Sequence, residues 1–310
     1  MNVDVVIVTY NRLEKLKKAL ASYENQSKTF RNMIVVNNHS TDGTYEYLEE
    51  WKNEEAPFTK YVITTEDNLG GSGGFYTGQK FAMTLNPDWV YLADDDAYAE
   101  HDMMEQFYKF CETHDAGKLS AICGTVFHPD GTVDFNHRSR FLTKGRRFVY
   151  RISSQVEDYH RPDFEIDFLS YVGPFINARA LKKAGLVDKD FFIYWDDSEH
   201  SMRLKEYGKL MCVPDIKIVH DDMVPGKLNE KQAVVSWKDY YLERNEMVFY
   251  KRHFPFVALH KVRVLFLDRL KGKHKGNPYA EIAWQAVKDA WIGKLGKHEL
   301  YKPGWEIKGV

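Results

Sequence analysis

Cysteine is scarce in this chain, and neither sign of charge is in excess. The 310 residues include three cysteines, Cys111, Cys123 and Cys212, with no C-x-x-C pair. This odd number argues against a disulfide framework or a zinc knuckle and favours a reducing compartment. Lys and Arg number 43 against 45 Asp and Glu, for a formal net charge of −2. General nucleic-acid binders carry a clear basic excess, so no nucleic-acid partner is expected.

Long hydrophobic runs and two common nucleotide-binding motifs are also missing. The apolar stretch at residues 3–8 is far shorter than a membrane span or the core of a signal peptide. The sequence has no G-x-x-x-x-G-K-[ST] phosphate loop and no G-x-G-x-x-G fingerprint. These absences argue against the commonest nucleotide-binding folds. The expectation is a cytoplasmic protein of one or two domains.

Strand-like and helix-like patterns alternate through the first hundred residues. This alternation predicts an α/β fold with a Rossmann-like, mostly parallel sheet flanked by helices. Apolar runs predict strands at residues 3–9, 33–36, 61–64, 89–93 and 216–219. Helical spacing predicts helices at residues 13–23, 44–51 and 75–85. A further helix is expected just after residues 195–199 and should run to Tyr207. Residues 138–163 show no clear period and are expected to be rich in loops.

Polar residues follow each of the first four predicted strands. Ligands of open α/β sheets bind beyond the carboxyl ends of the strands. Residues 9–12, 37–43, 67–74 and 94–96 are therefore expected to border one crevice. The glycines of residues 70–74 predict a loop before the next helix, where backbone N–H groups can approach a ligand.

Three adjacent carboxylates, Asp94, Asp95 and Asp96, follow the fourth strand. They repel one another unless a cation lies among them. Asp94 and Asp96 point the same way in an extended segment, and such a pair suits Mg²⁺ or Mn²⁺. His220, at the end of a later strand, is a candidate third ligand and would favour Mn²⁺. The alternative is a solvated acidic turn with a structural histidine.

A second acidic cluster, Asp196 and Asp197, stands at the start of a predicted helix and next to Trp195. A carboxylate in this position can take the proton from an attacking hydroxyl group. The alternative is that one of the two side chains caps the helix. Both roles can hold at once.

The C-terminal part differs in charge from the rest. Residues 256–310 contain 11 Lys and Arg but 5 Asp and Glu, which predicts a boundary between a domain of residues 1–255 and a basic helical region. Leu259, Val262, Phe266 and Leu270 recur at helical spacing among Lys and Arg. Such a helix either lies on an anionic membrane or packs its apolar stripe on its own domain.

Taken in order, four motifs resemble glycosyltransferase family 2, whose members have the GT-A fold. They are V-I-V-T-Y-N-R at residues 6–12, V-V-N-N-H-S-T-D-G-T at 35–44, the triplet D-D-D at 94–96 and W-D-D-S-E at 195–199. Within that family, N-L-G-G-S-G-G-F at residues 68–75, the triplet, the W-D-D-x-E motif and His220 are most similar to the galactofuranosyltransferase branch.

The resemblance implies an inverting, metal-dependent transferase with Mn²⁺ or Mg²⁺ as cofactor. It implies transfer of a sugar, galactofuranose from UDP-galactofuranose, to a hydroxyl group of a glycan or lipid-linked acceptor in cell-surface polysaccharide synthesis. Such an enzyme would work in the cytoplasm, in peripheral contact with the inner face of the membrane. The alternatives are rhamnosyl or hexopyranosyl transfer, a nucleotidyltransferase, and a non-catalytic nucleotide-sugar-binding subunit.

The resemblance also assigns roles to individual residues. The donor would be bound by Thr9, Tyr10, Asn11, Arg12, Asn37, Asn38, Asp42, Asn68, Gly70, Gly71 and Asp95. The metal ligands would be Asp94, Asp96 and His220. Asp197 would be the general base, with Asp196 and Glu199 orienting acceptor hydroxyls and Trp195 giving the sugar a flat surface. The segment Y-Y-L-E-R-N at residues 240–245 is similar to a Y-Y-x-x-R-N pattern of related bacterial transferases, where Arg244 would approach an acceptor phosphate. The preferred interpretation is helix packing, with Arg244 as a surface cation.

Overall fold

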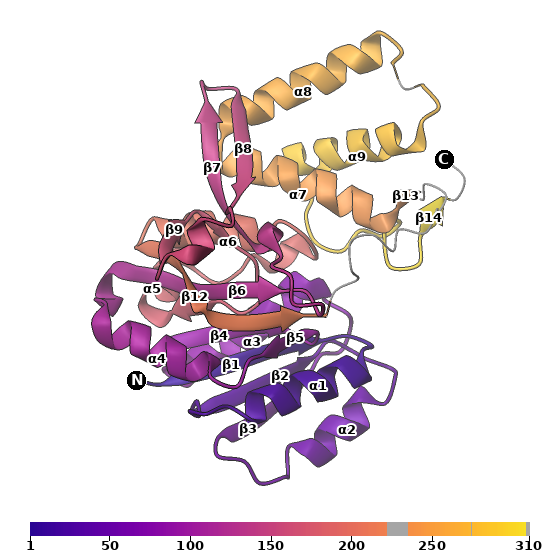
Figure 1. Cartoon of the computed structure of the whole chain (residues 1–310). Helices are drawn as coiled ribbons and strands as arrows, with labels where there is room; N and C mark the ends of the chain where they lie inside the picture. The colour runs from indigo at the N-terminus through magenta and orange to yellow at the C-terminus, as the bar shows by residue number, and fades with distance from the viewer. Residues whose placement is uncertain (222–234, 274, 308–310) are drawn as a thin grey trace.

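A computed structural model describes residues 1–221, 235–273 and 275–307. A sheet with helices on both faces forms the lower part of the molecule in Figure 1, and three C-terminal helices lie above it. The sheet strands are β1 (Val3–Thr9), β2 (Asn32–Asn37), β3 (Thr59–Thr64), β4 (Trp89–Asp94), β5 (Ala97–Ala99), β6 (Leu119–Phe127), β9 (Phe164–Ile166), β11 (Phe175–Asn177) and β12 (Lys209–His220). The helices around it are α1 (Leu13–Glu24), α2 (Thr44–Trp51), α3 (Gly70–Thr84), α4 (Met103–Thr113), α5 (Ala178–Ala184) and α6 (Asp196–Lys205).

The strand order is β3-β2-β1-β4-β11-β6-β12-β5, with β9 paired to β12. Pairing is parallel from β3 to β4 and between β6 and β12, whereas β11, β5 and β9 run antiparallel to their neighbours. The predicted α/β fold with a mostly parallel sheet is confirmed. The parallel strands therefore place their carboxyl ends at one edge.

Helices bury both faces of β1 and β2 along their full lengths. Side chains of β1 alternate between two core layers, as the period of a strand requires. Val5 belongs to the layer under α1, α2 and α4, and Val6 to the layer under α3, α5 and α6. Burial on both faces explains why these strands are continuous β-branched runs in the sequence.

The glycine-rich stretch is the start of α3, which corrects the expectation of a loop ahead of a helix at residue 75. Gly70 opens the helix with a φ of +73°. A Cβ on Gly74 would lie 2.5 Å from Val8, and one on Gly78 would lie 2.2 Å from Val6. These glycines let α3 pack directly on β1, and that packing overrides their low helix propensity.

Residues 138–163 are a second correction, because they contain a β-hairpin. Strands β7 (Arg138–Lys144) and β8 (Phe148–Ser153) pair antiparallel, and β10 (Phe168–Leu169) extends this small sheet. Most of the hairpin is exposed. It therefore lacks the apolar alternation from which a strand is predicted.

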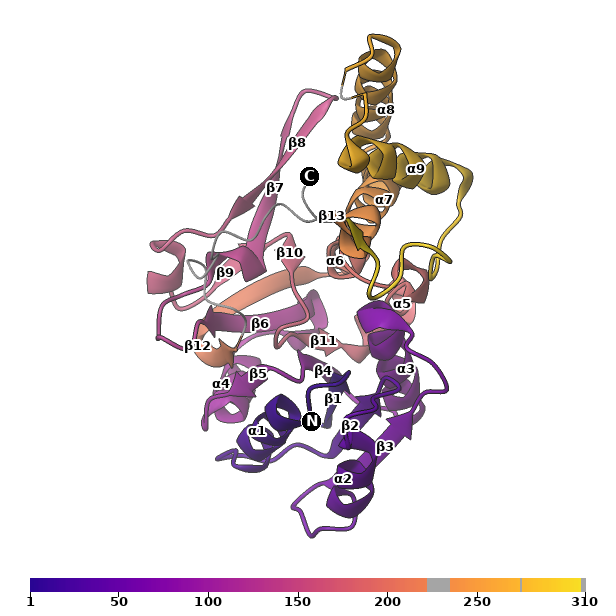
Figure 2. The ribbon, with the colours of Figure 1, turned by 90° about the vertical axis from the view of Figure 1, so that its right-hand side faces the viewer.

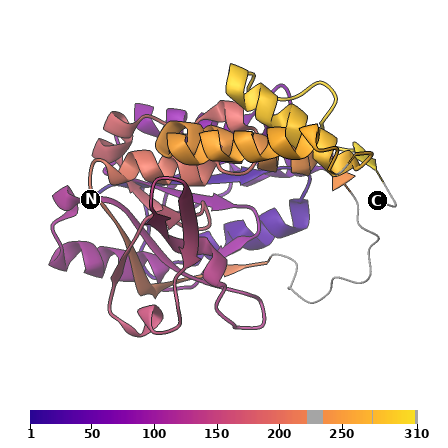
Figure 3. The ribbon, with the colours of Figure 1, turned by 90° about the horizontal axis from the view of Figure 1, so that it is seen from above.

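The C-terminal helices are α7 (Trp237–His253), α8 (Pro255–Leu270) and α9 (Pro278–Ile292), with a short pairing of β13 (Val235–Ser236) and β14 (Glu306–Ile307). A shared apolar cluster joins Phe249, Val257 and Val287 from the three helices. Figures 2 and 3 show α8 as the outermost of them, on the same side of the sheet as the hairpin. Within the described residues, none of the helices has the length and apolar character needed to cross a membrane.

Candidate active site

The aspartate triplet meets the end of β1. Asp95 and Asp96 form the turn between β4 and β5. The Thr9 hydroxyl donates to Asp95 Oδ2 at 2.7 Å, and the Tyr10 N–H donates to the same oxygen at 3.4 Å. Arg12 Nη1 contacts Asp95 Oδ1 at 3.3 Å and Asp96 Oδ2 at 2.6 Å. The structure thus gathers the two predicted donor-binding segments at one edge of the sheet.

Asp96 and His220 also come together, because β12 pairs with β5 beside the triplet. His220 Nε2 lies 3.3 Å from Asp96 Oδ1. Burial and the charge of Asp96 raise the pKa of Asp94 to about 8, whereas His220 and Arg12 outweigh burial and lower the pKa of Asp96. Within residues 1–221, 235–273 and 275–307, no group of three His, Cys, Asp or Glu side chains has a metal-binding arrangement. The set of Asp94, Asp96 and His220 stays a prediction.

The turn after β2 is held by its own side chains. Asn37 Oδ1 accepts from the Ser40 N–H at 3.0 Å, and Asn11 Oδ1 accepts from the Thr41 N–H at 2.7 Å. Asp42 accepts from the Leu13 N–H and the Thr44 hydroxyl, at 3.0 and 2.6 Å. Burial opposes these bonds, but they lower the pKa of Asp42. Part of this predicted donor-binding site therefore shapes the loop, and its nucleotide contacts stay a prediction.

Asn38 connects this turn to α3. Its Nδ2 donates to the Gly70 carbonyl at 2.9 Å and its Oδ1 accepts from the Leu69 N–H at 2.9 Å. Asn68 Oδ1 accepts from the Gly70 N–H at 2.8 Å. At the other side of the helix start, the Ser72 N–H donates to the Phe192 carbonyl at 3.2 Å. The predicted residues Asn38, Asn68 and Gly70 are thus one network that extends to the segment before α6.

The first two residues of α6 are Asp196, which is buried, and Asp197, which is partly buried. Burial and the neighbouring Asp197 raise the pKa of Asp196 to about 7, and the nearby Ser72 hydroxyl opposes the shift. Burial also raises the pKa of Asp197, against the opposing charge of Arg151. A carboxylate with a raised pKa is a better proton acceptor near neutral pH. Sequence analysis missed Arg151, because it lies on a strand that was expected to be a loop.

A strained segment precedes this pair. Phe192 is the centre of a γ-turn, with φ +68° and ψ −56°, closed by a hydrogen bond from the Ile193 N–H to the Phe191 carbonyl at 2.8 Å. Tyr194 and Trp195 also have positive φ values, +66° and +65°. Such conformations cost free energy outside glycine and persist where the surroundings impose them. The ring of Trp195 packs on α7, 5.1 Å from the ring of Phe249.

Two adjacent residues of α7 impose this conformation. Asn245 Nδ2 donates to the carbonyls of Phe191, Ile193 and Tyr194 at 2.9, 2.7 and 3.0 Å. Arg244 Nη2 donates to the Phe191 carbonyl at 2.9 Å. We refer to Arg244 and Asn245 as the α7 clamp.

Arg244 is 1% exposed, so the expectation of a surface cation is wrong. Its Nη1 donates to the Gly296 carbonyl at 2.7 Å, and its Nε donates to Asn245 Oδ1 at 2.9 Å. The guanidinium also lies 4.8 Å from the ring centre of Tyr241. Carbonyl dipoles and an aromatic ring can solvate a guanidinium away from water. The expectation of helix packing for Tyr240 and Tyr241 is confirmed, since both are buried.

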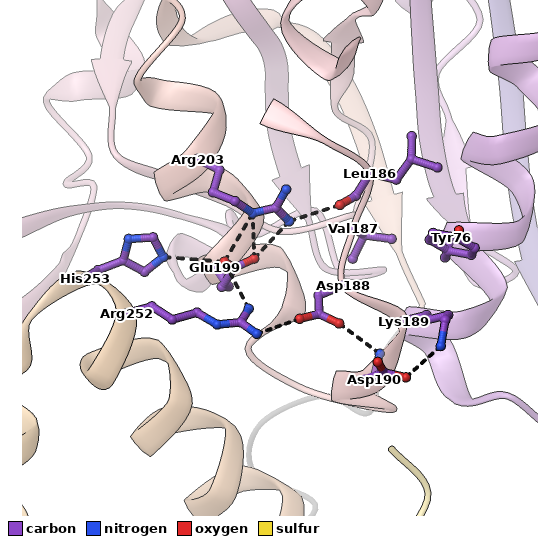
Figure 4. Close-up of a pocket in the computed structure, with 10 residues that line it drawn as sticks. All are labelled: Tyr76, Leu186, Val187, Asp188, Lys189, Asp190, Glu199, Arg203, Arg252 and His253. Atoms are coloured by element: carbon purple, nitrogen blue, oxygen red, sulfur yellow. Dashed lines mark hydrogen bonds and ion pairs between the residues drawn. The ribbon is translucent and has the colours of Figure 1, made fainter. Parts of the chain in front are cut away.

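Basic side chains hold the carboxylate of Glu199. Figure 4 shows its carboxylate among Arg203, Arg252 and His253, on the wall of a cavity of about 570 Å³. The distances are 2.9 Å to Arg203 Nη2, 3.2 Å to Arg252 Nη1 and 3.6 Å to His253 Nε2. Although burial opposes it, the contact with His253 and the charges of Arg203 and Arg252 lower the pKa of Glu199 to about 2. The carboxylate is already paired, and its role toward an acceptor stays a prediction.

We expect Glu199→Gln to lower the free energy of unfolding by about 2 kcal/mol. This loss is smaller than the roughly 3–5 kcal/mol lost when one partner of a fully buried ion pair is removed, because Arg252 is partly exposed. Since the pKa of Glu199 is lowered on folding, its stabilisation is present above the ordinary Glu pKa and disappears as the pH falls toward 2. Urea unfolding of both proteins from pH 7 to pH 3 measures this. A difference that does not shrink at acidic pH would contradict the assignment.

Gly70 and Gly71 form a matched pair of test positions. A Cβ on Gly70 would lie 2.0 Å from the Phe192 carbonyl oxygen, at a φ of +73°, whereas a Cβ on Gly71 meets no atom within 4 Å. Gly70→Ala should therefore lower the free energy of unfolding by about 2–4 kcal/mol. Gly71→Ala should raise it by up to about 1 kcal/mol. Equal stabilities of the two variants in thermal unfolding would contradict this packing.

The sheet, the strand-end turns and the paired carboxylates define the class of protein: the architecture is the GT-A fold. The crystal structure of GalNAc-T7 with UDP, GalNAc and Mn²⁺ has a TM-score of 0.62 over 97% of this chain and 56% of that chain, at 13% sequence identity. The model of the family described as Glycosyl transferase family 2 matches residues 4–184. The chain belongs to glycosyltransferase family 2.

Two curated relatives are similar to about two thirds of this chain. One is the galactofuranosyltransferase GlfT1 of Mycolicibacterium smegmatis, 32% identical over 209 residues, which are 66% of this chain and 65% of the relative. The other is GlfT1 of Mycobacterium tuberculosis, 34% identical over 209 residues, or 67% of this chain and 66% of the relative. The match thus spans slightly less than two thirds of each relative's length.

Proposed function

We propose that this glycosyltransferase moves galactofuranose from UDP-galactofuranose to a hydroxyl group of a glycan or lipid-linked glycan, with inversion at the anomeric carbon. The donor sugar is supported by the two relatives named galactofuranosyltransferase. The transfer chemistry is supported chiefly by one observation: Asp197 stands at the first turn of α6 with a pKa raised by burial.

In the proposed reaction Asp197 accepts the proton of the acceptor hydroxyl. The hydroxyl oxygen forms a bond to the anomeric carbon while the bond from that carbon to the diphosphate breaks, so that UDP leaves. A single displacement inverts the anomeric centre and needs no covalent intermediate. Asp196, whose pKa is raised to about 7, would hold the neighbouring hydroxyl. Buried beside α3, it is placed to keep the acceptor near the donor-binding network.

The donor would lie along the edge formed by Thr9, Arg12, Asn38 and Gly71. Arg12 supplies positive charge at the triplet, and its guanidinium is half exposed there. The residues fit a divalent cation in kind, since Asp96 and His220 are 3.3 Å apart and Asp94 adds a carboxylate whose pKa is raised by its acidic neighbour. Asp94, Asp96 and His220 would hold Mn²⁺ or Mg²⁺, which would neutralise charge on the diphosphate.

A donor panel tests this function. The purified chain is incubated with Mn²⁺ and UDP-galactofuranose, UDP-galactopyranose or dTDP-rhamnose, with a galactofuranose-containing oligosaccharide as acceptor. We expect transfer from UDP-galactofuranose with release of UDP. Transfer from only the pyranose or rhamnose donor would contradict galactofuranose as the donor sugar but retain the proposed transfer reaction. Release of pyrophosphate would indicate a nucleotidyltransferase, and binding without transfer from any donor would favour a non-catalytic subunit.

A further inference from the structure

Helix α8 presents an apolar stripe to solvent. Phe256, Leu259, Phe266 and Leu270 follow one another at intervals of three, seven and four residues, with exposed fractions of 53%, 52%, 49% and 68%. This spacing places them on one side of the helix. Val262, which the sequence grouped with this stripe, packs instead against the apolar cluster of α7 and α9. Of the two alternatives for this helix, packing of the whole stripe on its own domain does not describe the structure, because Leu259, Phe266 and Leu270 are exposed.

The β7–β8 hairpin continues this surface. Its side chains Leu142, Phe148 and Tyr150 are 56%, 46% and 48% exposed. The tip contacts the start of α8, where the Arg146 guanidinium lies 5.6 Å from the ring centre of Phe256. The ring of Phe148 lies 5.3 Å from that of His260. We refer to residues 142–150 and the outward stripe of α8 as the α8–hairpin surface.

Basic residues are frequent in the two segments that carry these apolar side chains. Residues 255–275 include six Lys and Arg and one Asp, and residues 142–150 include three Lys and Arg and no acidic residue. Lys261, Arg269 and Lys273 form ion pairs with Glu246, Glu281 and Asp268, so the excess of positive charge comes from the other basic residues. The protein as a whole has a formal net charge of −2, so this positive charge is a local feature. Apolar side chains among Lys and Arg are the pattern of helices that lie flat in the interface of an anionic bilayer.

We propose that the α8–hairpin surface docks on an anionic lipid bilayer. Two copies of the chain facing each other through it would bring two basic surfaces together, which electrostatic repulsion opposes. An anionic membrane complements both the charge and the apolar side chains. The surface lies at the end of the molecule farthest from α2 (Figure 1).

Docking through this surface would also bring the candidate base, Asp197, close to the membrane. This part of the inference rests on the proposed function. Strand β8 carries Phe148 near its tip and Arg151 three residues further along. At roughly 3.3 Å per residue these positions are about 10 Å apart. Arg151 interacts electrostatically with Asp197. A sugar chain anchored in the bilayer by a lipid would therefore meet the candidate base close to the membrane surface.

Vesicle sedimentation of the full chain tests the proposal. Vesicles of phosphatidylcholine with phosphatidylglycerol are compared with phosphatidylcholine alone, at low and high salt. We expect binding to the anionic vesicles, weakened by salt. The double variant Leu259→Glu and Leu270→Glu should reduce the bound fraction at least about tenfold. Tyr45→Glu, at a similarly exposed residue of α2 (47%), should bind as the parent protein does.

Three outcomes would overturn the proposal. The first is that the parent protein does not bind anionic vesicles, and the second is that the double variant binds them as well as the parent does while its circular dichroism spectrum is unchanged. The third is a dimer of the parent protein in solution that the double substitution dissociates. Sugar transfer to a water-soluble acceptor, measured in parallel, tests the proposed function separately from membrane docking. The double variant should transfer at the parent rate there, and vesicle binding by a chain that transfers nothing would reject the function but retain the docking surface.

Discussion

Replacing Asp197 by Asn is expected to lower kcat for sugar transfer by about 10²–10⁴-fold, the usual contribution of a general base. The amide has a similar size and can still accept from the Ser198 N–H, as Asp197 Oδ1 does at 2.6 Å. The helix start should therefore survive, and the KM for the donor should change little. Steady-state kinetics with UDP release as the signal measures both constants.

Asp215→Asn is the matched control, because Asp215 is exposed on β12 and has no part in the site. Its kcat should stay within about threefold of the parent value. Transfer by Asp197→Asn at more than a tenth of the parent rate would reject Asp197 as the base. In that case Asp196, the other carboxylate of the pair, would be the next residue to test.

The pH profile gives an independent measure of the same assignment. The base must be unprotonated, so kcat/KM should fall as the pH falls through the raised pKa of the Asp196 and Asp197 pair. Arg151 opposes the shift at Asp197, and its loss should raise that pKa further. Arg151→Gln is therefore expected to move the acidic limb to higher pH. A limb that stays in place or moves to lower pH would contradict the interaction.

Removal of the α7 clamp is the second large effect. Asn245→Ala leaves three carbonyls, of Phe191, Ile193 and Tyr194, without the side-chain N–H that they share. We expect a loss of about 3 kcal/mol in the free energy of unfolding, because the carbonyls of Ile193 and Tyr194 lose this donor, whereas that of Phe191 keeps Arg244 and the Ile193 N–H. The strained segment would relax and shift the start of α6. A displacement of about 1 Å at a catalytic group costs about 10²-fold in rate, so kcat should fall more than the donor KM rises.

Two further variants separate positioning from general destabilisation. Asn245→Asp keeps the size of the side chain but places acceptors opposite three carbonyls, so it should be at least as damaging as Ala. Leu242→Ala, at an exposed position of the same helix, should leave stability and kcat nearly unchanged. Kinetics are compared at a temperature where all the variants are folded. If Asn245→Ala kept the parent kcat and the parent fall of kcat/KM at acidic pH, the α7 clamp would contribute to stability alone.

The sequence predicted the sheet well, for a physical reason. Strands buried on both faces must be continuous apolar runs, and helices with one buried face must repeat every three or four residues. The ends of β1, β2 and β4 were located for this reason. The hairpin of β7 and β8 was missed because its side chains are mostly exposed, so no pattern marks it. Gly70–Gly74 were assigned to a loop because the contact that makes them helical, with β1, lies far away in the chain.

The sequence by itself determined which side chains end the parallel strands and which carboxylates begin α6. Strand periodicity and chain order fix those positions, whatever the distant contacts are. Only the tertiary structure decided how these side chains are used: Asp42 in its own turn, Glu199 with cations, and Arg244 inside the protein. Each of these interactions depends on residues that folding brings together from distant parts of the chain. A local sequence pattern contains no information about such contacts.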